Sequence, residues 1–75
     1  MKPTTLTINE CYNALAANDI HIGLKELTAR IQAGMYDWAD PSVSTKTASP
    51  TIYRELLIRW LEPRCEGGKV KGTML

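Results

Sequence analysis

The chain has 75 residues, of which 44% are hydrophobic and 23% charged, and its net charge is +1. This length gives one domain with a small core, and the ordinary composition argues against wholesale disorder. No apolar run approaches the roughly 18 residues of a transmembrane helix, and no secretory signal is visible, so we expect a soluble, cytoplasmic protein with no membrane contact. The sequence pI of about 7.8 is low for an isolated nucleic-acid-binding domain, where values above about 9 are more usual.

Enzyme chemistry has little support in the sequence. Cys11 and Cys65 are far apart and His21 is the single histidine, so no zinc-ligand spacing is present. The sequence contains no glycine-rich phosphate-binding loop. Cys11 and His21 could in principle act as nucleophile and base, but His21 falls in a predicted turn. We therefore expect no enzyme activity, metal, cofactor or small-molecule substrate.

The first predicted helix begins near residue 7. Residues 1–6 are expected to form an N-terminal arm, because Pro3 disfavours regular structure. The sequence Thr7-Ile8-Asn9-Glu10 has the spacing of a capping box, in which a threonine and a glutamate three residues later satisfy each other's backbone amides. Asn18-Asp19 supplies a turn. The predicted buried face of this helix consists of Ile8, Cys11, Tyr12, Leu15 and Ala16.

A second short helix is predicted between Gly23 and Gly34. Leu24, Leu27 and Ile31 recur at steps of three and four, which places them on one face. Gly34 tolerates the left-handed conformation that commonly ends a helix. Two helices joined by a turn are typical of a helix-turn-helix motif, whose second helix can lie in the major groove of DNA.

The outer face of this second helix carries the candidate DNA contacts. Lys25 and Arg30 suit phosphates or guanine, and Gln32 suits adenine. The small side chain of Ala29 permits close approach to the DNA. The carboxylate of Glu26 could accept a hydrogen bond from cytosine or oppose phosphate. An ordinary solvated helix face is the alternative interpretation. The candidates are Lys25, Glu26, Thr28, Ala29, Arg30 and Gln32.

The middle of the chain favours extended structure. Residues 35–40 alternate large apolar residues with acids, which predicts a short strand or extended segment that buries Tyr36 or Trp38. Residues 42–49 are rich in β-branched and hydroxylated side chains and fit either a hairpin or a polar loop. In a hairpin, the tip would offer Thr45, Lys46 and Thr47 to phosphates.

A third helix is predicted after Ser49-Pro50, a pair typical of a helix start. Glu62-Pro63 ends it, and residues 63–75 are expected to form a flexible, mildly basic tail. Ile58 lies off the apolar stripe and suggests a second contact surface. The stripe consists of Tyr53, Leu56, Leu57, Trp60 and Leu61.

These elements predict a mostly α fold with a small β wing: a winged helix-turn-helix of three helices plus a short hairpin over residues 7–62. From Leu6 to about Leu61 the order of elements resembles the excisionase-like branch of the MerR-type winged helix-turn-helix proteins of phages and mobile elements. The resemblance is carried by Leu-Thr-Ile-Asn-Glu at 6–10, by Ile22-Gly23, by the spacing of Leu27, Arg30, Ile31 and Gly34, and by Trp60-Leu61.

The resemblance implies a sequence-specific, double-stranded DNA-binding accessory or regulatory protein that acts in recombination, transcription or packaging. The second helix would enter the major groove through the six candidate residues, and Ser44 to Thr47 would form the wing. Self-association, or a recombinase or polymerase partner, would supply further affinity. The alternative is a protein–protein interaction module or inhibitor on the same scaffold.

Overall fold

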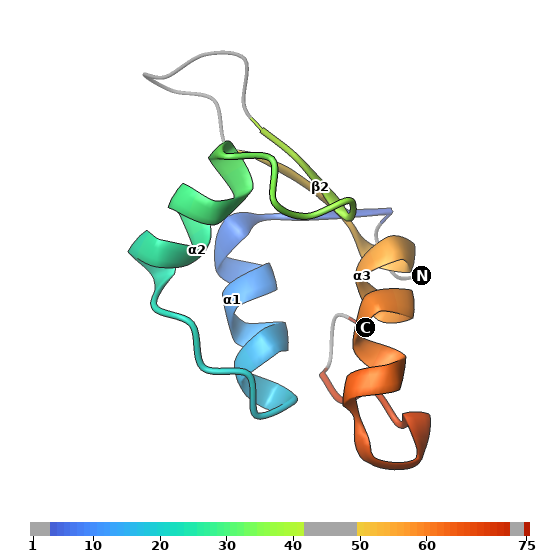
Figure 1. The fold of residues 1–75 in the computed structure, drawn as a ribbon. Coiled ribbons are helices and arrows are strands. Elements are labelled where there is room, and N and C mark those ends of the chain that lie inside the picture. Colours follow the sequence, from blue (N-terminus) through green and yellow to red (C-terminus); the bar gives the residue numbers. More distant parts are fainter. Residues whose placement is uncertain (1–3, 42–49, 73–74) are drawn as a thin grey trace.

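The computed structural model describes residues 4–41, 50–72 and 75, and Figure 1 shows the path of the chain. Three α-helices combine with a small antiparallel sheet, which confirms the predicted mixture of helix and a little strand. The helices are α1 (Ile8–Ala17), α2 (Leu24–Gln32) and α3 (Arg54–Leu61), followed by the 3₁₀ helices η1 (Glu62–Arg64) and η2 (Glu66–Gly68). The strands are β1 (Thr5–Leu6), β2 (Ala39–Asp40) and β3 (Thr51–Tyr53).

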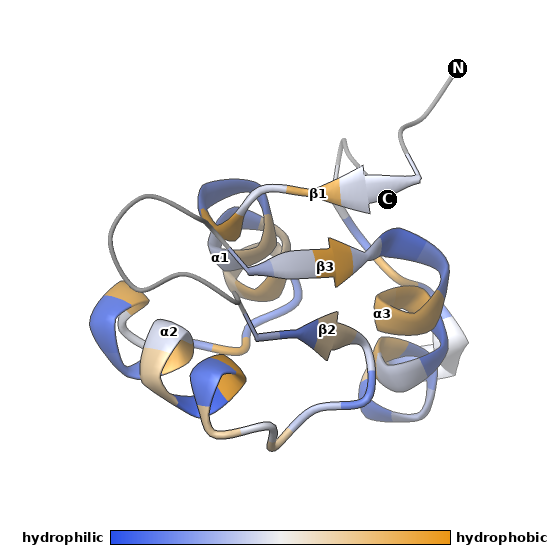
Figure 2. Ribbon diagram, turned by 90° about the horizontal axis from the view of Figure 1, so that it is seen from above, coloured by the Kyte–Doolittle hydropathy of each residue, from blue (hydrophilic) through white to orange (hydrophobic). Residues whose placement is uncertain are grey.

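The sheet has the order β1-β3-β2, and both pairs are antiparallel. Ile52 in the central strand lies opposite Leu6 on one side and Ala39 on the other, and all three side chains are buried. In Figure 2, α1 and α2 lie at one end of the sheet and α3 at the other. The core therefore forms where the helices meet the buried residues of these short strands.

Helix α1 begins with the predicted capping box. The Glu10 amide donates to Thr7 Oγ1 at 3.1 Å, and the Thr7 amide donates to Glu10 Oε1 at 2.9 Å. The predicted buried face is wrong at Tyr12, which is 38% exposed, while Ala14 is buried. The buried face is turned toward Ala14 because the C-terminal segment near Gly72 lies against it, a contact that helical periodicity does not reveal.

Helix α2 follows a turn in which Asp19 adopts a left-handed φ of 62°. Gly34, with φ 73°, comes just after its last turn, as predicted. Leu27 and Ile31 are fully buried, but Leu24 is 40% exposed, so its predicted place in the core is wrong. Ile20 and Ile22, in the connection before the helix, pack against the core and supply the apolar contacts at this end.

Helix α3 starts later than predicted. Residues 51–53 form the central strand β3, and the helix begins at Arg54. The helix start predicted at Ser49-Pro50 is wrong because β3 pairs with two strands from distant parts of the chain, and this pairing outweighs the local signal. The helix ends at Leu61, before Pro63, as predicted. Leu57 and Leu61 are buried, whereas Leu56 is 38% exposed.

Both expected terminal segments contribute to the fold. Thr5 and Leu6, placed in the arm by the sequence, form β1, and Leu6 is buried. Val70 and Leu75, placed in the flexible tail, pack against the core. These differences arise because β1 and the C-terminal residues gain their partners across long sequence separations. None of the described helices has the length and apolar content needed to cross a bilayer.

Candidate nucleic-acid interface

The outer face of α2 lies opposite Leu27 and Ile31, the two residues that hold the helix on the core. Thr28 and Arg30 are half-buried at its flanks. The four remaining candidates on this helix are exposed to solvent. They are Lys25, Glu26, Ala29 and Gln32. Lys25, Glu26 and Ala29 therefore lie on the outer face as predicted, and Thr28 and Arg30 lie at its edges.

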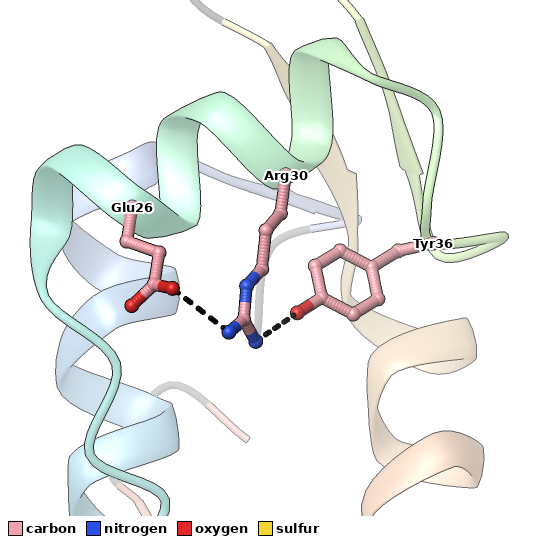
Figure 3. Close-up of polar contacts among 3 residues, drawn as sticks. All are labelled: Glu26, Arg30 and Tyr36. Atoms are coloured by element: carbon pink, nitrogen blue, oxygen red, sulfur yellow. Dashed lines mark hydrogen bonds and ion pairs between the residues drawn. The ribbon is translucent and has the colours of Figure 1, made fainter.

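A short polar network fixes one flank of α2 (Figure 3). Arg30 Nη2 donates to Glu26 Oε1 at 2.9 Å, and Arg30 Nη1 donates to the Tyr36 hydroxyl at 3.4 Å. The hydrogen bond to Tyr36, followed by the bond and charge of Glu26, raises the pKa of Arg30 above its ordinary value. The Glu26 charge is thereby compensated, and the Arg30 guanidinium is held toward Tyr36 instead of extending from the outer face.

Thr28 lies at the flank of α2 and has a partner within the helix. Its hydroxyl donates to the carbonyl of Leu24 at 2.9 Å, a common arrangement for threonine inside a helix. The Thr28 hydroxyl oxygen can still accept a hydrogen bond. Lys25, the other cation of α2, forms no ion pair with a carboxylate in the part of the chain that the structure describes.

The β2–β3 strand pair lies next to α2. Tyr53 donates its hydroxyl to Asp40 Oδ2 at 2.6 Å across this pair, and this hydrogen bond raises the pKa of Tyr53. Strand β2 contacts α2, and the ends of β2 and β3 that lead toward residues 42–49 lie at the α2 end of the sheet (Figure 2). Ser44, Thr45, Lys46 and Thr47, the predicted wing residues, lie outside the described residues.

An aromatic cluster that sequence reasoning did not assign to the site joins α2 to α3. Tyr36 stacks on the fully buried Trp38 with ring centroids 4.4 Å apart, and it packs edge-to-face with Trp60 with ring centroids 5.8 Å apart. The prediction that Tyr36 or Trp38 enters the core is confirmed by Trp38. The role of Tyr36 as the partner of Arg30 has no signal in helical or strand periodicity, because Tyr36 lies in the connection between α2 and β2.

The remaining chemistry is modest. Burial raises the pKa of Cys11 to about 12, so this thiol does not have the properties of a nucleophile, and His21 is exposed. Residues 4–41, 50–72 and 75 contain no group of three potential metal ligands. No protein-family model, curated protein or solved structure matches this chain.

Proposed function

We propose that this protein binds double-stranded DNA as a small winged helix-turn-helix factor, with α2 in the major groove and the β2–β3 hairpin beside it. The observation that carries the proposal is the outer face of α2. It presents Lys25, Ala29 and Gln32 to solvent, and its carboxylate Glu26 is neutralised by Arg30. The order of elements, with β1 before two helices and an antiparallel strand pair before α3, supports the same reading.

The groove contacts follow from the size and polarity of these side chains. Major grooves admit an α-helix, and Ala29 allows the helix backbone to approach the bases. Lys25 is suited to a phosphate, and the Gln32 amide can pair with the edge of adenine. Among the described residues Arg30 is paired with Glu26, which leaves Lys25 as the cation of α2 available for a phosphate; we infer that one copy binds weakly and that self-association or a protein partner such as a recombinase or polymerase adds affinity.

We infer an accessory or regulatory role in recombination, transcription or packaging, of the kind found in phage and mobile-element proteins. This part of the proposal rests on the resemblance of the sequence from Leu6 to Leu61 and on the element order above. A protein–protein module on the same scaffold is the rival, and it predicts no affinity of the α2 face for DNA.

The test is fluorescence anisotropy of labelled random and candidate regulatory duplexes across a salt series. We expect binding that falls steeply with salt and at least one duplex held more tightly than the random pool. Ala29→Glu should weaken binding to every duplex, because it places a carboxylate in the groove. Lys25→Ala should reduce the salt slope by about 1, the value for one lost phosphate contact.

Lys69→Ala is the matched control, since Lys69 is an exposed cation on the segment after α3. It should leave affinity and salt slope unchanged. Lys46→Ala tests the proposed wing and should weaken binding to all sequences alike. Absence of binding at low salt and high protein concentration would overturn the proposal and favour the rival.

A further inference from the structure

A row of three side chains four residues apart runs along α3 and η1: Leu56, Trp60 and Arg64. Leu56 is 38% exposed, Arg64 is exposed, and Trp60 is half-buried. Tyr36 joins the row from the segment after α2, because its ring packs edge-to-face with the Trp60 ring. We call these four residues the aromatic row.

Contacts made by Trp38 and by Arg64, itself a member of the row, hold the aromatic row in place. Trp38, fully buried, stacks on Tyr36 and lies against Trp60 with centroids 5.6 Å apart. Arg64 lies over the Trp60 ring, 4.0 Å from its centroid, and donates to the Trp60 carbonyl at 2.7 Å. These contacts fix the rings and the guanidinium before any partner arrives, which lowers the entropy lost on binding.

Two arginines lie beside the α3 part of the aromatic row, while the exposed Asp37 follows Tyr36 in the chain. Glu55 accepts from Arg54 at 2.8 Å, and its charge is thereby compensated. Arg59, exposed next to Leu56 on the helix, and Arg64 form no ion pair with any described carboxylate. Glu62 lies beyond Arg59 around the helix, on the side away from Leu56 and Trp60. An apolar and aromatic strip is thus bordered by two uncompensated guanidinium groups.

We propose that the aromatic row docks a protein segment that carries carboxylates beside apolar side chains. Tryptophan, tyrosine and arginine are the residues that most often dominate binding energy at protein interfaces, and the two guanidinium groups complement acidic side chains. Stacking of nucleic-acid bases is disfavoured because Trp38 covers one face of Tyr36 and Arg64 covers one face of Trp60.

The α3 part of this surface is separate from the outer face of α2, and Tyr36, which accepts from Arg30, lies between the two. α3 lies at the end of the sheet opposite α2 (Figure 2), so we expect a duplex on the outer face of α2 to leave α3 uncovered. The inference goes beyond the proposed function, and it does not require that DNA binding be correct.

The test selects peptides from a random phage-displayed library on the purified full chain. We expect enrichment of peptides that combine aspartate or glutamate with apolar residues. Synthetic copies of the enriched peptides should bind Leu56→Asp and Arg59→Glu/Arg64→Glu about tenfold or more weakly than the unmodified protein. Tyr12→Asp is the matched control, since Tyr12 on α1 is also 38% exposed, and it should bind as the unmodified protein does.

Three results would overturn the proposal. They are enrichment of peptides without carboxylates, equal binding by Leu56→Asp and the unmodified protein, and competition for the row by a single-stranded oligonucleotide. Circular dichroism and thermal unfolding verify that each variant is folded. Arg59→Gln/Arg64→Gln keeps hydrogen-bond donors while removing the charges, and it should lose most of the preference for acidic peptides.

Discussion

At the scale of single residues, Asn18 connects the end of α1 to the C-terminal segment. Its Nδ2 donates to the carbonyls of Ala14 and Lys71, at 2.8 and 2.7 Å. Its Oδ1 accepts from the Lys71 amide at 2.6 Å and from the Cys65 thiol at 3.4 Å. One side chain therefore satisfies the backbone of Lys71 in both directions.

Asn18→Ala should lower the free energy of unfolding by about 1–3 kcal/mol, because it removes these hydrogen bonds at a half-buried position. Urea denaturation monitored by tryptophan fluorescence measures the change. Asn13→Ala, at an exposed position of α1, is the control and should change stability little. Equal stabilities of the Asn18 and Asn13 variants would show that the Asn18 bonds contribute nothing net.

The two thiols differ in environment. Cys11 is fully buried, and burial raises its pKa to about 12, whereas Cys65 is half-buried near the surface. Iodoacetamide at neutral pH should therefore add one label to the native chain, at Cys65, and two labels after unfolding. Peptide mass spectrometry gives the position. Native labelling of Cys11 at a rate similar to Cys65 would contradict the burial of the α1 inner face.

At the scale of elements, the β2–β3 pair depends on a pH-sensitive contact. Tyr53 donates to Asp40, and the pKa of Tyr53 is raised above its ordinary value of 10.0 mainly by this hydrogen bond. A raised folded-state pKa means that the stabilisation is fully present below about pH 10 and is lost as pH rises through the folded-state value.

Tyr53→Phe should therefore be less stable than the unmodified protein at neutral pH, and the difference should shrink as pH rises above about 10. Chemical denaturation at a series of pH values measures it. Tyr12→Phe, which changes the same group on α1, controls for the ionisation of other tyrosines. A difference that stays constant through the alkaline range would show that the Asp40 bond does not stabilise the pair.

Some helix ends are set by local sequence signals, whereas the strands are set by pairing between distant parts of the chain. The capping box at Thr7, the glycine at 34 and the proline at 63 set helix ends through contacts within a few residues, and each was readable in the sequence. Ser49-Pro50 is an equally strong local signal, yet a strand follows it. Ile52 is buried between Leu6 and Ala39, and neither partner is near it in the sequence.

At the scale of the whole molecule, the last residues tie α1 to α3. Val70 and Leu75 pack against the core, and Arg54 at the start of α3 donates to the Leu75 carbonyl at 3.3 Å. In Figure 1 the C-terminal end lies beside α3. The hydrogen bond between the Lys71 amide and Asn18 connects the same segment to the end of α1. A 75-residue domain has a small core, so we expect the contacts of this segment to contribute to its stability.

Deletion of residues 69–75 should lower the free energy of unfolding by about 2–4 kcal/mol, through lost apolar burial and the lost Asn18 bonds. Thermal unfolding of the truncated chain measures this. Lys69→Ala/Lys71→Ala retains the backbone and the apolar contacts, and it should unfold as the intact protein does. A truncated chain of unchanged stability would instead match a flexible basic tail.

The sequence by itself determined that there are three helical segments, that Leu27 and Ile31 are buried on the inner side of α2, and that an aromatic residue from residues 35–40 enters the core. These features depend on helical periodicity, capping and hydrophobicity, which act over a few residues. Tertiary structure decided the rest: the central place of β3, the roles of Leu6 and Leu75, and the turning of Arg30 toward Tyr36. Each of these depends on a partner from a different element, and the pattern of a single segment does not encode which partner that will be.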